Sequence, residues 1–135
     1  MTERELNIVR DLNAQIRELE THLVTLRRCI ENLSPKLDGL PRSTTIQSQV
    51  EKIALEIVES SRELEALREQ ILFATAKLTN EICRAVVAPQ ERTVLILRYV
   101  ACMNFRDISF QLNFSDRKVY ALHHDGLKNL QMTCS

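Results

Sequence analysis

The chain has 135 residues, of which 44% are hydrophobic, and its basic and acidic side chains are equal in number. With two glycines, three prolines and 4% aromatic residues, this composition favours an all-α protein of one or two small units. The longest uncharged apolar runs, ILFATA and TVLIL, are too short to cross a bilayer, and the charged N-terminus is unlike a signal peptide. We therefore expect a cytoplasmic protein that does not enter a membrane.

The first segment carries a continuous heptad repeat. Its apolar residues alternate in steps of three and four, with mostly β-branched residues at one seam position and Leu at the other, as in two-stranded coiled coils. They are Val9, Leu12, Ile16, Leu19, Leu23, Leu26, Ile30 and Leu33. Thr2 is a suitable N-cap, and Glu3 and Glu5 suit the positive end of the helix dipole. The pattern predicts a helix over about 2–33, ended by a loop at 34–44 that contains two prolines and a glycine.

A second heptad repeat predicts a helix over about 45–87 that runs antiparallel to the first. Its seam residues are Val50, Ile53, Ile57, Ser60, Leu64, Leu67, Ile71, Ala74 and Leu78. The first helix is shorter, so it would leave Ile71, Leu78 and Ile82 exposed unless a second chain or the C-terminal unit covered them.

Residues 1–88 are therefore expected to be a coiled-coil oligomerisation region that forms a homodimer or a higher homo-oligomer. The expected oligomerisation residues are Ile16, Leu19, Leu23, Leu26, Leu64, Leu67, Ile71 and Leu78. The alternative is that the two heptad segments form an intramolecular hairpin and nothing else. Parallel and antiparallel pairing between chains both stay open, because the flanking positions carry no clear charge code.

The last third of the chain predicts short helices. Pro89 suits the first turn of a helix over QERTVLILRYV; by propensity TVLILRYV could also be a strand, but the sequence offers no partner strand. Asn104 can cap a helix over FRDISFQL, Asn113 suits a left-handed turn position, and Ser115 can cap the last helix. Two helices joined by such a turn describe a helix-turn-helix. Residues 89–135 are therefore expected to be a DNA-binding domain, and their six basic against four acidic side chains permit this.

In a helix-turn-helix the second helix lies in the major groove. Four residues of the last helix lie opposite its apolar stripe and are expected to contact bases: Arg117, Tyr120, Ala121 and His124. Arg117 could donate two hydrogen bonds to guanine, and Ala121 could contact a thymine methyl group. The expected phosphate contacts are Arg106, Lys118 and Lys128. The alternative is an ordinary solvated helix face, with Tyr120 and His124 packed against a neighbouring helix.

The segment PQERTVLILRYVACMNFRDISFQLNFSDRKVYALHHDGLKNL resembles region four of bacterial sigma factors, a promoter-reading domain. The resemblance is carried by ERxVLxLRY, by RDI together with Leu112, and by the pattern S-x-x-x-V…L…L-x-x-L of the last helix. Cys102 and Asn113 stand where that family usually has Gly, Ser109 stands where it has a small Ala, and no region-two sequence is present. The resemblance thus implies promoter binding rather than the activity of a complete sigma factor.

Taken whole, two coiled-coil helices followed by this unit are similar to small phage and prophage transcriptional regulators of Gram-positive bacteria. That resemblance implies sequence-specific binding to double-stranded DNA and allows an additional contact with RNA polymerase. The alternative is a protein-interaction module that docks on RNA polymerase or another partner without reading DNA.

The sequence does not favour an enzyme. It contains no Gly-rich phosphate loop, no H-E-x-x-H and no nucleophile elbow. Cys29, Cys83, Cys102 and Cys134 are widely spaced, and without a C-x-x-C pair they are expected to be reduced thiols rather than metal ligands. We expect no cofactor, no metal and no small-molecule substrate.

Overall fold

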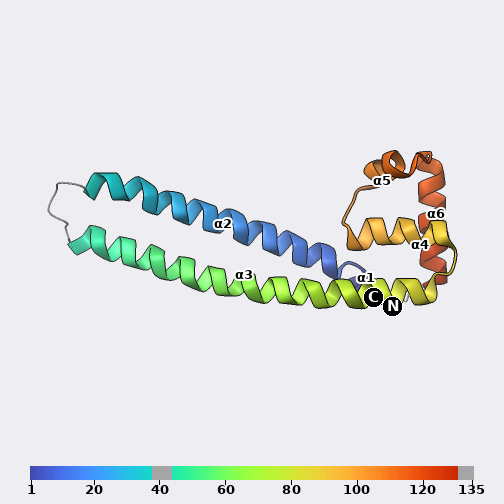
Figure 1. Cartoon of the computed structure of the whole chain (residues 1–135), viewed down its shortest axis with the longest axis horizontal. Helices are drawn as coiled ribbons and strands as arrows, with labels where there is room; N and C mark the ends of the chain where they lie inside the picture. Colours follow the sequence, from blue (N-terminus) through green and yellow to red (C-terminus); the bar gives the residue numbers. More distant parts are fainter. Residues whose placement is uncertain (38–43, 131–135) are drawn as a thin grey trace. The chain divides into compact units, whose positions relative to one another are not determined.

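The computed structural model describes residues 1–37 and 44–130, together with the side chains of 1–33 and 47–130. The elements of this described part are helices (Figure 1), which confirms the prediction of an all-α protein. They are α1 (Glu3–Leu6), α2 (Ile8–Leu37), α3 (Thr44–Ala85), α4 (Pro89–Leu95), the π-helical turn η1 (Ile96–Val100), α5 (Phe105–Leu112) and α6 (Asp116–Asn129). None of these helices has both the length and the apolar composition that a membrane crossing requires.

The first long helical segment begins where the sequence predicts. The Thr2 hydroxyl accepts a hydrogen bond from the Glu5 N–H at 3.2 Å, and the Glu5 carboxylate accepts one from the Thr2 N–H at 2.9 Å. This reciprocal capping box satisfies two backbone donors at the helix start. Helix α2 continues beyond the predicted end at residue 33, through Pro35 to Leu37. Proline removes one backbone donor, so the helix loses a bond at Pro35 but still completes its last turn. Residues 38–43 of the predicted loop lie outside the described residues.

The chain divides into two compact units. The hairpin unit comprises residues 14–69, and the terminal unit comprises residues 1–13 and 70–135. Within the hairpin unit α2 and α3 run side by side in opposite directions (Figure 1). Arg68 forms an ion pair with Glu20 at 3.4 Å, and His22 lies 3.3 Å from Glu56. These four side chains are about half exposed, so their pairs add little to stability.

The apolar seam is buried within a single chain. In the hairpin unit Ile16, Leu23, Leu64 and Leu67 are buried, and Leu19 and Leu26 are half-buried. In the terminal unit Leu78 and Ile82 are 3% and 0% exposed, and Ile71 is half-buried. A second chain is therefore not needed to bury the residues predicted as oligomerisation contacts.

Leu78 and Ile82 are covered within the terminal unit of the same chain, and N-terminal residues contribute to this cover. Leu6 and Val9 are 2% and 1% exposed in the same unit. Residues from both chain segments, Glu5 and Ala74 among them, line one groove. The seam predicted for the first segment begins at Val9, and the structure adds the buried Leu6 before it.

The long helices also contribute to the terminal unit through hydrogen bonds. The Asn13 side-chain amide of α2 donates to the Cys102 Sγ at 3.2 Å, and the Arg92 Nη2 donates to the Cys83 carbonyl of α3 at 3.4 Å. The division between the two units falls within α2, after Asn13, and within α3, after Glu69, whereas the sequence places a domain boundary after residue 88.

The segment after α3 is helical, as predicted, and Pro89 occupies its first turn. The helix then widens: the Ala101 N–H donates to the Ile96 carbonyl at 3.0 Å, five residues back, and the Met103 N–H donates to the Leu97 carbonyl at 3.0 Å. Cys102 has a left-handed φ of 60°. A side chain in this conformation costs about 1–2 kcal/mol, whereas glycine adopts it freely. Cys102 therefore occupies a backbone position that glycine would occupy without this cost.

The last two helices have the predicted caps. The Asn104 side chain accepts from the Asp107 N–H at 2.8 Å, and the Ser115 hydroxyl accepts from the Lys118 N–H at 3.2 Å. Asn113 is left-handed, with φ 56° and ψ 37°, as expected. Val94, Ile108 and Val119 form a fully buried cluster beneath them. The partly buried residues that pack on this cluster are Leu97, Met103, Phe105, Leu112, Phe114 and Leu122.

Gly126 allows a close approach between α6 and α4. A Cβ atom at this position would lie 2.9 Å from Leu95 Cδ1 and 3.1 Å from Leu95 Cγ. Leu95 is fully buried and has little room to move aside. The absence of a side chain at 126 therefore sets the spacing of the two helices.

Ser109 provides a test of the packing between α5 and α6. It is 8% exposed, and its hydroxyl has no hydrogen-bond partner among the described residues. Ser109→Ala removes this unsatisfied group, so we expect the free energy of unfolding to rise by about 1 kcal/mol, measured by urea denaturation. The exposed Ser48→Ala should change it by less than about 0.5 kcal/mol. A clear loss of stability in Ser109→Ala would contradict this packing.

Candidate nucleic-acid interface

Helix α6 has a buried side and an exposed side. Val119 and Gly126 are buried against the rest of the terminal unit. The four residues predicted to contact bases are all exposed: Arg117, Tyr120, Ala121 and His124. At 3.6 residues per turn their spacing of three and four puts them on one side of the helix. The structure therefore brings these four side chains together on a solvent-facing surface, which we call the outer face of α6.

The ring of Tyr120 packs against the ring of Phe105. It is 54% exposed, and its ring centroid lies 4.8 Å from that of Phe105 at an interplanar angle of 38°. Phe105 itself packs on the buried cluster. Tyr120 is thus both packed against a neighbour and open to solvent, so its ring is positioned without being enclosed.

The predicted phosphate contacts Arg106, Lys118 and Lys128 are also exposed. Lys128 follows His124 by one turn, so it extends the outer face of α6 towards its C-terminus. The Lys118 Nζ lies 4.0 Å from the centre of the Phe114 ring, a cation–π contact that orients this ammonium group.

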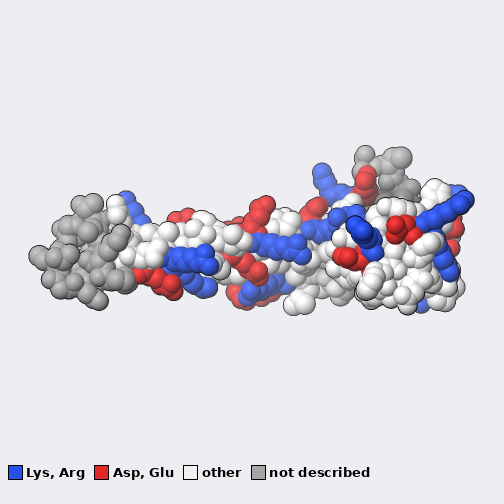
Figure 2. Space-filling model, turned by 90° about the horizontal axis from the view of Figure 1, so that it is seen from above, with Lys and Arg blue, Asp and Glu red and all other residues white. Residues whose placement is uncertain are grey.

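The electrostatic support for binding an anion is moderate. The first turn of α6 contains Asp116, and Asp125 lies beside Ala121 on the same helix; both are exposed. On the face drawn in Figure 2, basic and acidic side chains are interspersed rather than gathered into one basic patch. Affinity would therefore have to come from specific contacts as well as from charge.

Directly beneath the outer face lies a cluster that the sequence analysis did not anticipate. The Tyr99 hydroxyl lies 2.6 Å from His123 Nε2, and the His123 ring meets the edge of Phe105 at 4.9 Å between centroids. The Arg98 guanidinium lies 4.4 Å above the Phe105 ring and donates to the Met103 carbonyl at 3.0 Å. These contacts connect η1 to the inner side of α6. Their sequence spacing gives no hint of the cluster, because η1 and α6 are brought together only by the fold.

Burial determines the protonation of this cluster. It lowers the pKa of His123 below 6.5, and the charges of Arg98 and His124 lower it further. Burial also raises the pKa of Tyr99 above 10.0, although Arg98 and Arg10 oppose this. With His123 neutral, the Tyr99 hydroxyl can donate its proton to Nε2.

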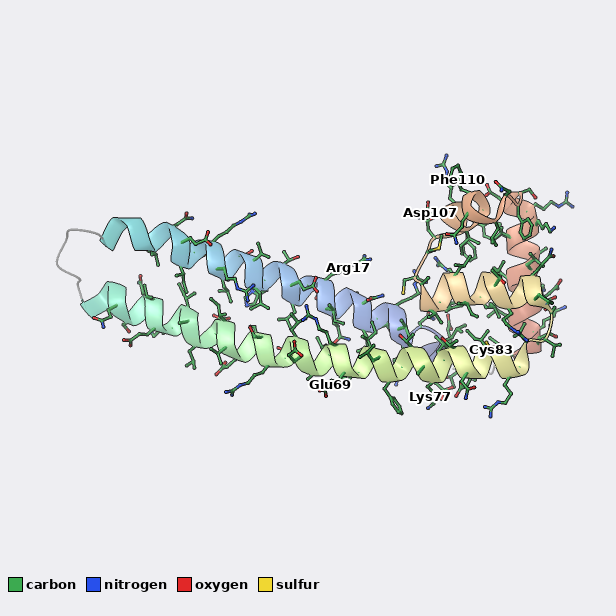
Figure 3. All side chains as sticks on the ribbon, in the orientation of Figure 1. Arg17, Glu69, Lys77, Cys83, Asp107 and Phe110 are labelled. Atoms are coloured by element: carbon green, nitrogen blue, oxygen red, sulfur yellow. The ribbon has the colours of Figure 1, made fainter. Side chains whose placement is uncertain are left out.

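Another exposed residue is Phe110, which sequence analysis also missed. Figure 3 shows it projecting outward from α5, and it is 87% exposed. Its position outside the inner stripe of Phe105, Ile108 and Leu112 is the signal that could have singled it out. An exposed aromatic residue of this kind suits contact with a protein partner.

Comparison of the chain with protein-family models, with curated proteins and with solved structures finds no match in any of the three. The functional interpretation therefore depends on the geometry of the chain itself.

The lowered pKa of His123 predicts a pH dependence of stability. Below pH 6.5 the unfolded chain binds a proton at this position before the folded chain does. The contribution of His123 to the free energy of unfolding should therefore be complete above pH 6.5. It should decrease as the pH falls towards the lower pKa of the folded state. Urea denaturation at several pH values would show this dependence. This pH dependence should be weaker in His123→Gln. It should be retained in the control His22→Gln, because His22 lies in the hairpin unit. Equal pH dependence of stability in wild type and His123→Gln would contradict the assignment to His123.

Proposed function

We propose that the chain is a sequence-specific DNA-binding transcriptional regulator, in which α5 and α6 form a helix-turn-helix similar to sigma-factor region four. The observation that carries the proposal is the outer face of α6, where Arg117, Tyr120, Ala121 and His124 share one exposed side. The left-handed turn at Asn113 and the N-cap at Ser115 support the same motif.

In the proposed complex α6 enters the major groove with its N-terminal turns nearest the bases. Arg117 donates to a guanine, Ala121 contacts a thymine methyl group, and Tyr120 and His124 contact bases or sugars. Arg106, Lys118 and Lys128 bind phosphates and fix the register. A cytoplasmic homodimer on a coiled-coil hairpin would present two such helices to two half-sites.

A second candidate function is favoured by Phe110. Its 87% exposure on α5, next to the exposed Arg106 one turn earlier, would suit a module that docks on RNA polymerase or another protein without reading DNA. The two functions predict different outcomes for substitutions on α5 and on α6.

The proposal predicts the effect of Arg117→Ala. A DNA sequence is first selected from a random duplex pool and then used in gel-shift titrations at moderate salt. Loss of a bidentate contact to guanine should weaken binding to the selected duplex by about 1–3 kcal/mol, and preference at one base pair should relax. Arg62→Ala, an exposed arginine of the hairpin unit, serves as the matched control and should bind like wild type. Failure to select any sequence, with Phe110→Ala abolishing capture of RNA polymerase, would favour the docking module instead.

Lys128 is predicted to act differently from Arg117. If it neutralises a phosphate, Lys128→Ala should weaken binding to all duplexes to a similar degree. The slope of the logarithm of affinity against the logarithm of salt concentration should become shallower by about 1. An unchanged slope would show that Lys128 does not bind a phosphate. It would not contradict the role of Arg117.

A further inference from the structure

Four aromatic side chains connect η1 with the outer face of α6. Tyr99 stacks on His123, with ring centroids 5.7 Å apart and an interplanar angle of 26°. The His123 ring meets the edge of Phe105, and Phe105 packs against the exposed Tyr120. We call these four residues the aromatic bridge. It runs from a buried side chain, Tyr99, to a side chain that we propose contacts DNA.

The inner end of the aromatic bridge has a well-fixed backbone. Tyr99 lies in the π-helical turn η1, where the Ala101 N–H donates to the Ile96 carbonyl. The Arg98 guanidinium donates to the Met103 carbonyl and so holds the turn that follows η1. Short π-helical turns of this kind occur frequently at functional sites. A rearrangement of the bridge is therefore expected at its outer members rather than at Tyr99.

The outer end of the aromatic bridge depends on Phe105. Tyr120 and His123 are three residues apart on α6, so their side chains are neighbours on the helix surface. Both contact the ring of Phe105, and the Arg98 guanidinium lies 4.4 Å above its centre. In such close packing a shift of one ring is passed to the next. A displacement of the His123 ring therefore alters the support of Tyr120.

The hydrogen bond between Tyr99 and His123 depends on the protonation of His123. The Tyr99 hydroxyl lies 2.6 Å from Nε2, and a neutral imidazole can accept its proton there. A protonated imidazole is a donor at both ring nitrogens, so the hydroxyl would have to point its own hydrogen elsewhere. Tyr99 is 7% exposed, and a buried donor without an acceptor carries a cost.

The surrounding charges also oppose a proton on His123. The charged groups that act on Tyr99 and His123 come from four elements: Arg98 of η1, His124 of α6, Arg10 of α2 and Glu3 of α1. Helix α5 contributes the uncharged ring of Phe105. Because Arg98 keeps its charge, a proton on His123 would place two cations beside this one ring. His123 is half-buried, so its ring can turn towards solvent when it carries a proton.

We propose that Tyr99 and His123 are positioning residues for DNA recognition, and that protonation of His123 displaces Tyr120 from the arrangement that binds DNA. This inference rests on the proposed function, because it concerns the regulation of the same face. It means that sequence-specific binding weakens in acid although the chain becomes more positive. An added positive charge alone would strengthen binding to DNA, so the two effects have opposite signs.

The first test is made on the free chain by nuclear magnetic resonance. The chain has two tyrosines and three histidines, so their ring signals can be assigned with single substitutions. As the pH falls, the Tyr120 signals should move with the same midpoint as those of His123, below pH 6.5. This movement should be lost in His123→Gln and retained in His124→Gln, the matched control that removes the other histidine near Tyr120. Movement that persists in His123→Gln, or none in wild type, would overturn the proposal.

Tyr99→Phe distinguishes positioning from a purely structural role. The substitution keeps the stacked ring but removes the hydroxyl that favours neutral His123. The midpoint of His123 should therefore rise towards pH 6.5, and the movement of Tyr120 should rise with it. A loss of packing alone would lower stability without this shared change. An unchanged midpoint of His123 in Tyr99→Phe would show that the hydrogen bond does not control its protonation, and the proposal would fail.

The second test measures affinity for a duplex selected from a random pool, over the acid range in which circular dichroism shows the chain to be folded. Wild type should lose affinity for this duplex by about 5-fold or more as the pH falls through the midpoint of His123, the lower end of usual coupling between two sites. Affinity for an unrelated duplex should not fall. The loss should be absent in His123→Gln, begin at higher pH in Tyr99→Phe, and be unchanged in His22→Gln of the hairpin unit.

The outcomes separate this inference from the proposed function. A selected duplex that wild type binds equally or more tightly in acid would overturn the role of His123 and leave DNA binding intact. Failure to select any duplex would overturn the proposed function, and with it the regulation of DNA binding, whatever the Tyr120 signals show.

Discussion

Helix α6 approaches α4 closely because residue 126 has no side chain. The position that a Cβ would occupy is 2.9 Å from Leu95 Cδ1, and Leu95 is enclosed on all sides. This close approach seats one side of α6, including Val119, on the buried cluster. The opposite side is thereby turned to solvent, so the exposure of Arg117 and His124 is a consequence of how α6 packs.

The turn before α6 adds a second constraint. The left-handed Asn113 ends α5, and the Phe114 N–H donates to the Ser109 carbonyl at 3.1 Å, a bond typical of Schellman-type helix ends. Phe114 packs on the same buried cluster and also supports the ammonium group of Lys118. A single apolar cluster thus determines both the angle between the two helices and the position of a cationic side chain.

Beneath the outer face, Tyr99 and His123 form a polar contact beside the ring of Phe105 and the guanidinium group of Arg98. Phe105 touches both His123 and Tyr120, so it connects this contact with an exposed ring of the outer face. The neutral form of His123 is the one that burial favours. The stability of the unit and the position of Tyr120 therefore depend on the same group of aromatic side chains.

Local features were predictable from the sequence because local chemistry determines them. Thr2, Asn104 and Ser115 were identified as caps, and Asn113 as left-handed, since short polar side chains suit these backbone positions. The exposed side of α6 followed from its helical period. The pairing of Tyr99 with His123 was not predictable, because it joins helices that only the tertiary fold brings together.

The hydrophobic spacing of α3 does not show which helix covers its apolar side. The Leu-rich repeat that includes Leu64 and Leu67 is strong, and it was assigned to contacts between chains although the structure buries it within one chain. Hydrophobic spacing identifies which residues share a face, but not which face is covered by the chain's own helices.

The most direct test of the central claim, that the outer face of α6 binds DNA, is chemical-shift mapping. The nitrogen-15-labelled chain would be titrated with a duplex selected from a random pool, and the change at each backbone amide recorded. The largest changes are expected in α6 between Asp116 and Lys128 and near Arg106 of α5, while the hairpin unit is unaffected. Changes confined to α3 or to the surroundings of Phe110, with the amides of α6 unperturbed, would contradict it.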